Sequence, residues 1–222
     1  MTPQAAAAGQ AAEHTPRSGV RFGWPARYVL QCAALAGLYY GSARFGYKVG
    51  FSGPIAAMVW LPVGIAISGL SLFGLALWPG VLVGDLLAND YSTVLLGPAI
   101  AQTAGNMLEC LVAAYLIRRL MKRGSPLRTV TGVTGIIGAA ALGTAISAIV
   151  GPLSIYIGGV LGDESLFTVM RTWWLGDFCG VLVVVPLVLA WHTLPFRRLS
   201  RAELVEGAAM IAVVALLAEL SS

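Results

Sequence analysis

The chain is a series of long apolar segments separated by short polar connections. A helix needs about 20 residues to cross the hydrocarbon core of a bilayer, and most of these segments are close to that length. The period-two alternation of membrane β-strands is not visible in them. The pattern predicts an all-α fold, a polytopic transmembrane bundle of about seven helices. The seven apolar segments are residues 27–43, 54–73, 74–89, 94–120, 130–158, 167–191 and 202–220.

The third segment is the shortest of the series. Only Gly74 and residues 77–80, which read LWPG, separate it from the second segment. We expect this helix to be tilted, broken or not fully spanning. The segment is still needed in the helix count, because without it one cluster of basic residues would lie on the wrong side of the membrane.

The first residues differ from the rest of the chain. Residues 1–25 are rich in Ala, Gly and Gln and contain no apolar stretch of the length found in a secretory signal peptide. The composition predicts two regions: a disordered cytoplasmic tail over residues 1–25 and an integral membrane domain over residues 26–222.

Lys and Arg residues indicate how the helices are oriented. They cluster before the first segment, after the fourth and after the sixth, and all three clusters lie inside if the N-terminus is cytoplasmic. The seventh helix would then end outside, so we expect the chain to be a fragment of a longer protein. The clusters are Arg17, Arg21 and Arg27; Arg118, Arg119, Lys122, Arg123 and Arg128; and Arg197, Arg198 and Arg201.

The overall composition agrees with a membrane location. Of the 222 residues, 58% are hydrophobic and 11% are charged, whereas soluble domains contain about 25% charged residues. The net charge of +4 comes from the clusters beside apolar segments, so the lipid bilayer is the expected partner and nucleic acid is not. The three cysteines, Cys32, Cys110 and Cys179, form no CxxC or Cys/His pattern, so we expect neither a disulfide nor a metal site.

Charged residues inside the predicted helices are the first functional candidates, because a charge in the bilayer costs several kcal/mol by insertion scales. Asp85, Glu109, Arg171 and Asp177 are four such residues. By their positions along the helices, Asp177 lies near mid-membrane and Arg171 near the outer surface. Three acids with one distant base require protons, water or a bound cationic group to neutralise them.

Polar residues accompany two of these acids. Asn89 is four residues after Asp85, so both share one helix face. Gln102, Asn106 and Glu109 form one polar stripe on the fourth predicted helix. Such residues can simply hydrogen-bond neighbouring helices, and a protonated carboxyl group can do the same.

Tryptophans and glycines in the predicted helices are expected to anchor the helices and to let them pack closely. Trp173 and Trp174 suit interfacial anchors as well as ligand contacts, and Trp60 with Pro62 is expected to cap a pocket. Three GxxxG pairs permit close helix approach: Gly80 with Gly84, Gly158 with Gly162, and Gly176 with Gly180. The residues predicted to bind a ligand or to carry a signal are Asp177, Glu109, Asn106, Asp85, Trp174 and Trp60.

The chain lacks the signatures of common enzymes. It has no phosphate-binding GxxxxGK[ST] loop, no GxSxG and no HExxH. Its two histidines lie in the N-terminal tail, at His14, and at the inner membrane edge, at His192. We therefore expect no catalytic residues, no cofactor and no enzymatic activity in this chain.

Four short motifs occur in order on consecutive predicted helices. Residues 59–66 read VWLPVGIA; residues 77–84 read LWPGVLVG and are followed by LAN at 87–89. Gly105 and Asn106 precede Glu109, and residues 173–177 read WWLGD, followed by Gly180. From about residue 27 onward the chain resembles the MASE1 family, the membrane-associated sensor 1 domain of bacteria.

The resemblance implies a sensory input domain of about eight helices in the bacterial plasma membrane. Histidine kinases, diguanylate cyclases and cyclic-di-GMP phosphodiesterases are the usual outputs of such domains, so a cytoplasmic output domain in cis is the implied partner. Asp85 stands where small residues are usual in the family, which favours Asp177 over Asp85 as a signalling residue. A homodimer or another membrane protein as partner, and a small transporter or channel subunit as the function, remain open alternatives.

Overall fold

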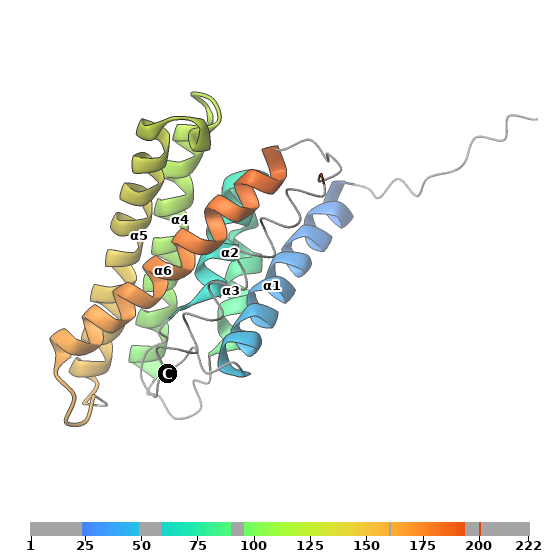
Figure 1. Ribbon diagram of the computed structural model, residues 1–222. Coiled ribbons are helices and arrows are strands. Elements are labelled where there is room, and N and C mark those ends of the chain that lie inside the picture. The colour runs from blue at the N-terminus through green and yellow to red at the C-terminus, as the bar shows by residue number, and fades with distance from the viewer. Residues whose placement is uncertain (1–23, 49–58, 90–95, 160, 194–199, 201–222) are drawn as a thin grey trace, which may run out of the picture.

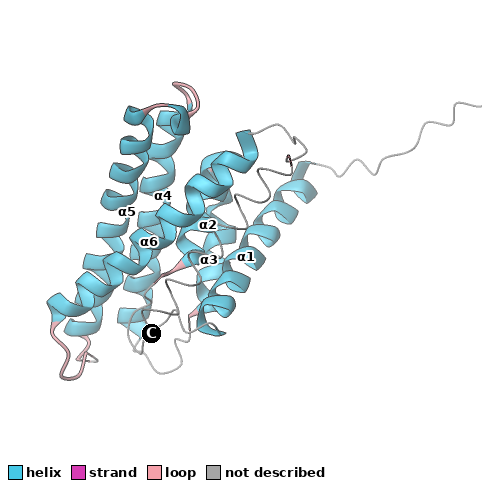
Figure 2. Cartoon of the chain, in the orientation of Figure 1, coloured by secondary structure: helices cyan, strands magenta, loops and turns pink. Residues whose placement is uncertain are grey.

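The structure, a computed structural model, describes residues 24–48, 59–89, 96–159, 161–193 and 200. Within these ranges every regular element is helical, which confirms the predicted all-α fold (Figure 2). The predicted tail over residues 1–25 lies almost entirely outside them, and the seventh segment, 202–220, lies wholly outside. The elements are α1 (Trp24–Lys48), α2 (Leu61–Phe73), the 3-10 turn η1 (Leu75–Leu77), α3 (Trp78–Ala88), α4 (Leu96–Met121), the 3-10 turn η3 (Pro126–Arg128), α5 (Val130–Ile157) and α6 (Leu166–Thr193) (Figure 1).

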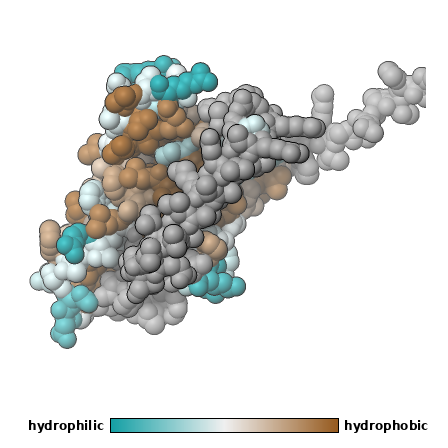
Figure 3. Space-filling view, viewed as in Figure 1, coloured by the Kyte–Doolittle hydropathy of each residue, from teal (hydrophilic) through white to brown (hydrophobic). Residues whose placement is uncertain are grey.

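The helices have the length and surface of a membrane bundle. Among the described residues, α4, α5 and α6 are each long and apolar enough to cross a bilayer, and α2 and α3 are shorter apolar helices. Large apolar side chains face outward, such as Ile100, Leu142 and Val183, all more than half exposed. Figure 3 shows hydrophobic residues across the middle of the visible face and hydrophilic residues at its ends. Together these features make the chain an integral membrane protein.

The second and third predicted segments form two short helices. α2 starts at Leu61, where Pro62 occupies the first turn and favours a helix start. It ends before Gly74, whose φ of 121° suits glycine and stops the helix. α3 then has 11 residues, which agrees with the expectation of a short, broken third segment.

Glycines set the closest helix contacts. A Cβ on Gly80 would lie 2.5 Å from the carbonyl oxygen of Cys32, and one on Gly84 would lie 2.7 Å from Tyr39 Cβ. The first GxxxG pair therefore holds α3 against α1, and the order of the contacts makes these two helices parallel. Gly158 and Gly162 do not form a pair on one helix, because α5 ends at Ile157 and Gly162 lies in the following turn with a φ of 64°. Gly158 still approaches α4 closely, since an added Cβ would lie 2.7 Å from Pro98 Cγ.

Side-chain hydrogen bonds connect the start of α1 and the end of α4 to the end of α2 and the connection after it, all at one end of the bundle. The Tyr28 hydroxyl donates to the carbonyl oxygen of Ala76 at 2.9 Å, which joins the start of α1 to the α2–α3 connection. Arg118 Nη1 donates to the carbonyl oxygens of Leu70 and Ser71 at 3.2 and 2.7 Å, which joins the end of α4 to the end of α2. A cation at this position also suits the negative end of the α2 dipole. In Figure 1 the α4–α5 connection and the end of α6 lie at this same end.

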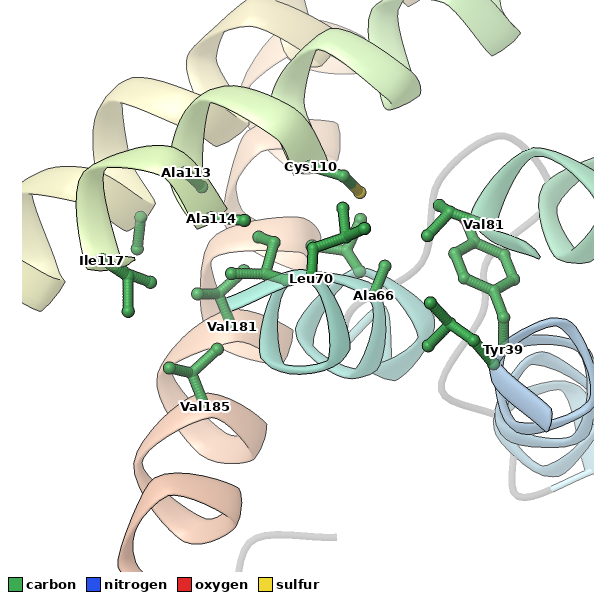
Figure 4. Close-up of a cluster of buried hydrophobic side chains, with 14 of the residues drawn as sticks. Tyr39, Ala66, Leu70, Val81, Cys110, Ala113, Ala114, Ile117, Val181 and Val185 are labelled. Carbon is green, nitrogen blue, oxygen red and sulfur yellow. The ribbon is translucent and has the colours of Figure 1, made fainter. Parts of the chain in front are cut away.

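The core lies where α2 meets α4, α6 and α1. Ala66 and Leu70 of α2 face Cys110 and Ala114 of α4, with Val181 of α6 close by (Figure 4). All of these side chains are buried. Small residues at this interface let the helices approach closely, which is how membrane helices gain packing energy.

Candidate functional site

Asp85 is the centre of a buried polar network between α1, α3 and α4. The side chain is 0% exposed, and its Oδ1 accepts three hydrogen bonds. These come from the Tyr39 hydroxyl at 2.9 Å, from Asn106 Nδ2 at 2.9 Å and from Asn89 Nδ2 at 3.0 Å. The network thus ties three helices to one carboxyl group.

Asp177 forms the second polar contact, on the other side of α4. It is 4% exposed, and its Oδ2 accepts a hydrogen bond from Ser147 Oγ on α5 at 2.9 Å. Trp173, one turn earlier on α6, also interacts with this carboxyl group. The indole of Trp173 lies against Gly151 of α5, where an added Cβ would be 3.0 Å from the ring.

Glu109 lies on α4, one turn after Asn106. It is 0% exposed, and neither of its carboxyl oxygens has a hydrogen-bond partner in the part of the chain that the structure describes. The Ser147 hydroxyl is adjacent to it, and the carboxyl groups of Asp177 and Asp85 are close enough to interact with it electrostatically. Three acids from three helices therefore share one buried region.

The start of α2 is attached directly to α6 beside Asp177. The backbone N–H of Trp60 donates to the carbonyl oxygen of Gly176 at 2.9 Å. A Cβ on Gly180 would collide with the carbonyl oxygen of Trp60, and one on Gly64 would lie 2.5 Å from the carbonyl oxygen of Gly180. α2 and α6 thus touch backbone to backbone at the level of the acid on α6.

The two tryptophans predicted as site residues are both half-buried and both join helices. Trp174 stacks on Phe178 with 5.2 Å between ring centroids, and its Nε1 donates to the carbonyl oxygen of Ala141 on α5 at 3.3 Å. Trp60 contacts Tyr47 of α1 edge to face at 5.6 Å. These contacts are structural, and a role of either ring in binding a ligand stays a prediction.

The structure brings the predicted acids together and adds two residues that sequence reasoning missed. Asn89 shares a face with Asp85, as predicted, and donates to it. Asn106 and Glu109, predicted as one stripe, have different surroundings: Asn106 bonds Asp85, whereas Glu109 lies near Ser147. The missed residues are Tyr39 and Ser147, whose signal in the sequence is weak because one hydroxyl in an apolar helix is common.

Replacing Asp85 with alanine is expected to lower the free energy of unfolding by about 3 kcal/mol. The change leaves the Tyr39 hydroxyl and the Asn106 amide buried without an acceptor, and each such group costs about 1–3 kcal/mol. Unfolding of the purified protein in lipid bicelles by a denaturing detergent measures this. Asp163→Ala is the control, because Asp163 is exposed in the α5–α6 connection. Equal stability of the two variants would contradict the network.

The site offers little for metal binding. In the described ranges, no group of three or more His, Cys, Asp or Glu side chains is arranged to hold a metal ion. Protons and hydrogen bonds are the chemistry that this arrangement supports.

Comparison with known proteins gives one family match over most of the chain. The family model of MASE1 matches residues 31–222. This range includes all the residues of the site, from Tyr39 on α1 to Asp177 on α6. No curated protein and no solved structure matches the chain.

Proposed function

The chain belongs to the MASE1 family of membrane-associated sensor domains, and we propose that it is the sensory input module of a bacterial signal-transduction protein. Residues 26–222 form the sensor domain in the plasma membrane, and residues 1–25 form a cytoplasmic tail. The output is a histidine kinase or a cyclic-di-GMP enzyme linked to the module in the cytoplasm, so the module itself has no catalytic role.

One observation carries this proposal beyond the family: the buried acids connect α1, α3, α4, α5 and α6. Asp85 joins α1, α3 and α4, and Asp177 joins α5 and α6. A change at either acid alters contacts on several helices at once. A stimulus shifts such a bundle only by its different affinity for two arrangements, and buried, polar contacts between helices are where such a difference arises.

α6 is the helix best placed to pass the change on. It carries Asp177 near its middle and ends at Thr193, at the same end of the bundle as Arg118 and Tyr28. Pro186 lies between the acid and this end. Because Gly180 touches the start of α2, movement of α6 also moves α2.

A specific observation favours a second candidate function, a small transporter or channel subunit. α2 has 13 residues, and short or broken helices beside mid-membrane acids are typical of secondary transporters. Uptake of a solute into proteoliposomes that required Asp177 would favour this candidate over the sensor.

The sensor function requires the end of the bundle near Arg118 to face the cytoplasm, where the output acts. We expect a topology reporter fused after Arg123 to report a cytoplasmic location and one fused after Asp163 to report an external location. The reason is the basic cluster of the α4–α5 connection, which the positive-inside rule keeps in the cytoplasm. An external reading after Arg123 would refute both the orientation and the proposed relay.

A further inference from the structure

Glu109 is the buried group whose surroundings are hardest to reconcile with a negative charge. Its two carboxyl oxygens have no hydrogen-bond partner among the described residues, and the side chain is 0% exposed. An ionised carboxylate that is buried without a partner is strongly disfavoured, and the group takes up a proton instead. The charged groups that act on Glu109 are Asp177 and Asp85, which repel a further negative charge.

The hydroxyl of Ser147 gives an independent reason. A serine hydroxyl has one proton to donate and two lone pairs to accept. Ser147 donates its proton to Asp177 at 2.9 Å, with a longer contact of 3.4 Å to the carbonyl oxygen of Thr144. The same hydroxyl is adjacent to Glu109. While Ser147 donates to Asp177, it can serve Glu109 only as an acceptor, and only a protonated Glu109 can donate to it.

The space around Glu109 limits what else could bind there. A Cβ on Gly143 of α5 would lie 2.7 Å from Ala113 Cβ and 3.1 Å from the carbonyl oxygen of Glu109. One turn away, a Cβ on Gly105 would lie 3.1 Å from Val150 Cβ. α4 and α5 are thus in close contact on both sides of the acid, which leaves no room for an organic ligand between them.

A cavity large enough for an organic molecule lies elsewhere. Its volume is about 410 Å³, and it is lined mainly by apolar side chains of α1 and α2, such as Leu38, Ile65 and Leu72. None of the three acids lines it. The buried acids and this cavity are therefore separate features of the bundle.

We propose that Glu109, Ser147 and Asp177 form a proton-binding site, and that the proton is the ligand of the sensor; this inference rests on the proposed function and names its stimulus. In the state with one proton, Glu109 holds the proton and donates to Ser147 Oγ, while Ser147 donates to a charged Asp177. In the state with two protons, Asp177 has taken up a second proton from solution and its negative charge is lost. The two states differ by one bound proton, so the proton concentration shifts the balance between them.

Other titratable groups surround the site and respond to this charge. Asp85 on α3 interacts with both acids, and Cys110, next to Glu109 on α4, interacts with all three. Tyr39 on α1 interacts with Asp85 and Asp177. α2 presents Ala66 and Leu70 beside Cys110 (Figure 4). The loss of charge at Asp177 therefore affects α1 and α3 through the Asp85 network, as well as α4 and α6 directly.

Infrared spectroscopy of the 222-residue protein in lipid bilayers tests the proton directly. At neutral pH we expect the carbonyl-stretch band of a protonated carboxylic acid that exchanges slowly in heavy water. The band should be lost in Glu109→Gln and retained in Glu164→Gln, whose parent side chain is exposed in the α5–α6 connection. Ser147→Ala should shift the band, because the protonated acid then loses its acceptor.

Labelling the protein with ¹³C-glutamate gives the same assignment without any substitution, since the Glu109 band then moves and aspartate bands do not. The proposal is overturned if no protonated glutamate band is present at neutral pH. It is also overturned if added sodium at constant pH removes the band, because the site would then prefer a metal cation.

The proton site and the sensory function fail in different ways. A missing glutamate band overturns the proton site and leaves the sensory function standing. A band that is present, together with a signalling output that ignores Glu109→Gln and external pH, supports the proton site and contradicts the sensory function.

Discussion

Replacing Gly180 with alanine should lower the free energy of unfolding by about 2–4 kcal/mol. The new Cβ would collide with the carbonyl oxygen of Trp60, a backbone atom that cannot rotate away. Overpacking of this kind costs about 1–3 kcal/mol. Separating α2 from α6 would also break the Trp60–Gly176 hydrogen bond, which is worth about 1 kcal/mol.

Matched controls for this substitution exist in the same bundle. Gly138→Ala on α5 and Gly37→Ala on α1 add the same methyl group at positions where no atom of the described residues lies within 4 Å of it. Both should leave stability unchanged or raise it slightly, because alanine favours helix over glycine. Detergent-induced unfolding in bicelles, followed by circular dichroism, compares the three variants. A Gly180→Ala protein as stable as the controls would show that α2 and α6 are not in backbone contact.

The fold was predictable because apolar segment length is a strong signal. The bounds of α4, α5 and α6 lie within two residues of the predicted segments 94–120, 130–158 and 167–191. The start of α2 was not predictable from hydropathy, since residues 54–73 are apolar throughout. Pro62 favours the start of this helix locally, and the contact of Trp60 and Leu61 with Gly180 fixes its position against α6.

The candidate site was predictable in part. Asp85, Glu109 and Asp177 stand out in any apolar helix because a buried charge is rare. Which acid has which partner was not predictable, because this depends on the rotation of each helix about its axis. The family resemblance favoured Asp177 over Asp85, yet Asp85 accepts side-chain hydrogen bonds from Tyr39, Asn89 and Asn106, whereas Asp177 accepts one from Ser147.

The proposed sensory function requires the buried acids to respond to the stimulus. In the protein with its output domain, we expect Asp177→Asn and Glu109→Gln each to reduce the response by about 5-fold or more, the range typical of coupling between two sites. Each substitution keeps the shape of the side chain and removes its titration. Asp163→Asn and Glu164→Gln make the same chemical changes at exposed positions of the α5–α6 connection and should respond like the parent.

The measurement that bears most directly on the sensory function is this output assay, made on membranes that contain equal amounts of each variant. Locked or blunted output in Asp177→Asn and Glu109→Gln, with normal output in both exposed controls, is the expected result. A normal response in both buried variants would contradict the proposal, because the acids would then be packing groups and the stimulus would act elsewhere in the bundle.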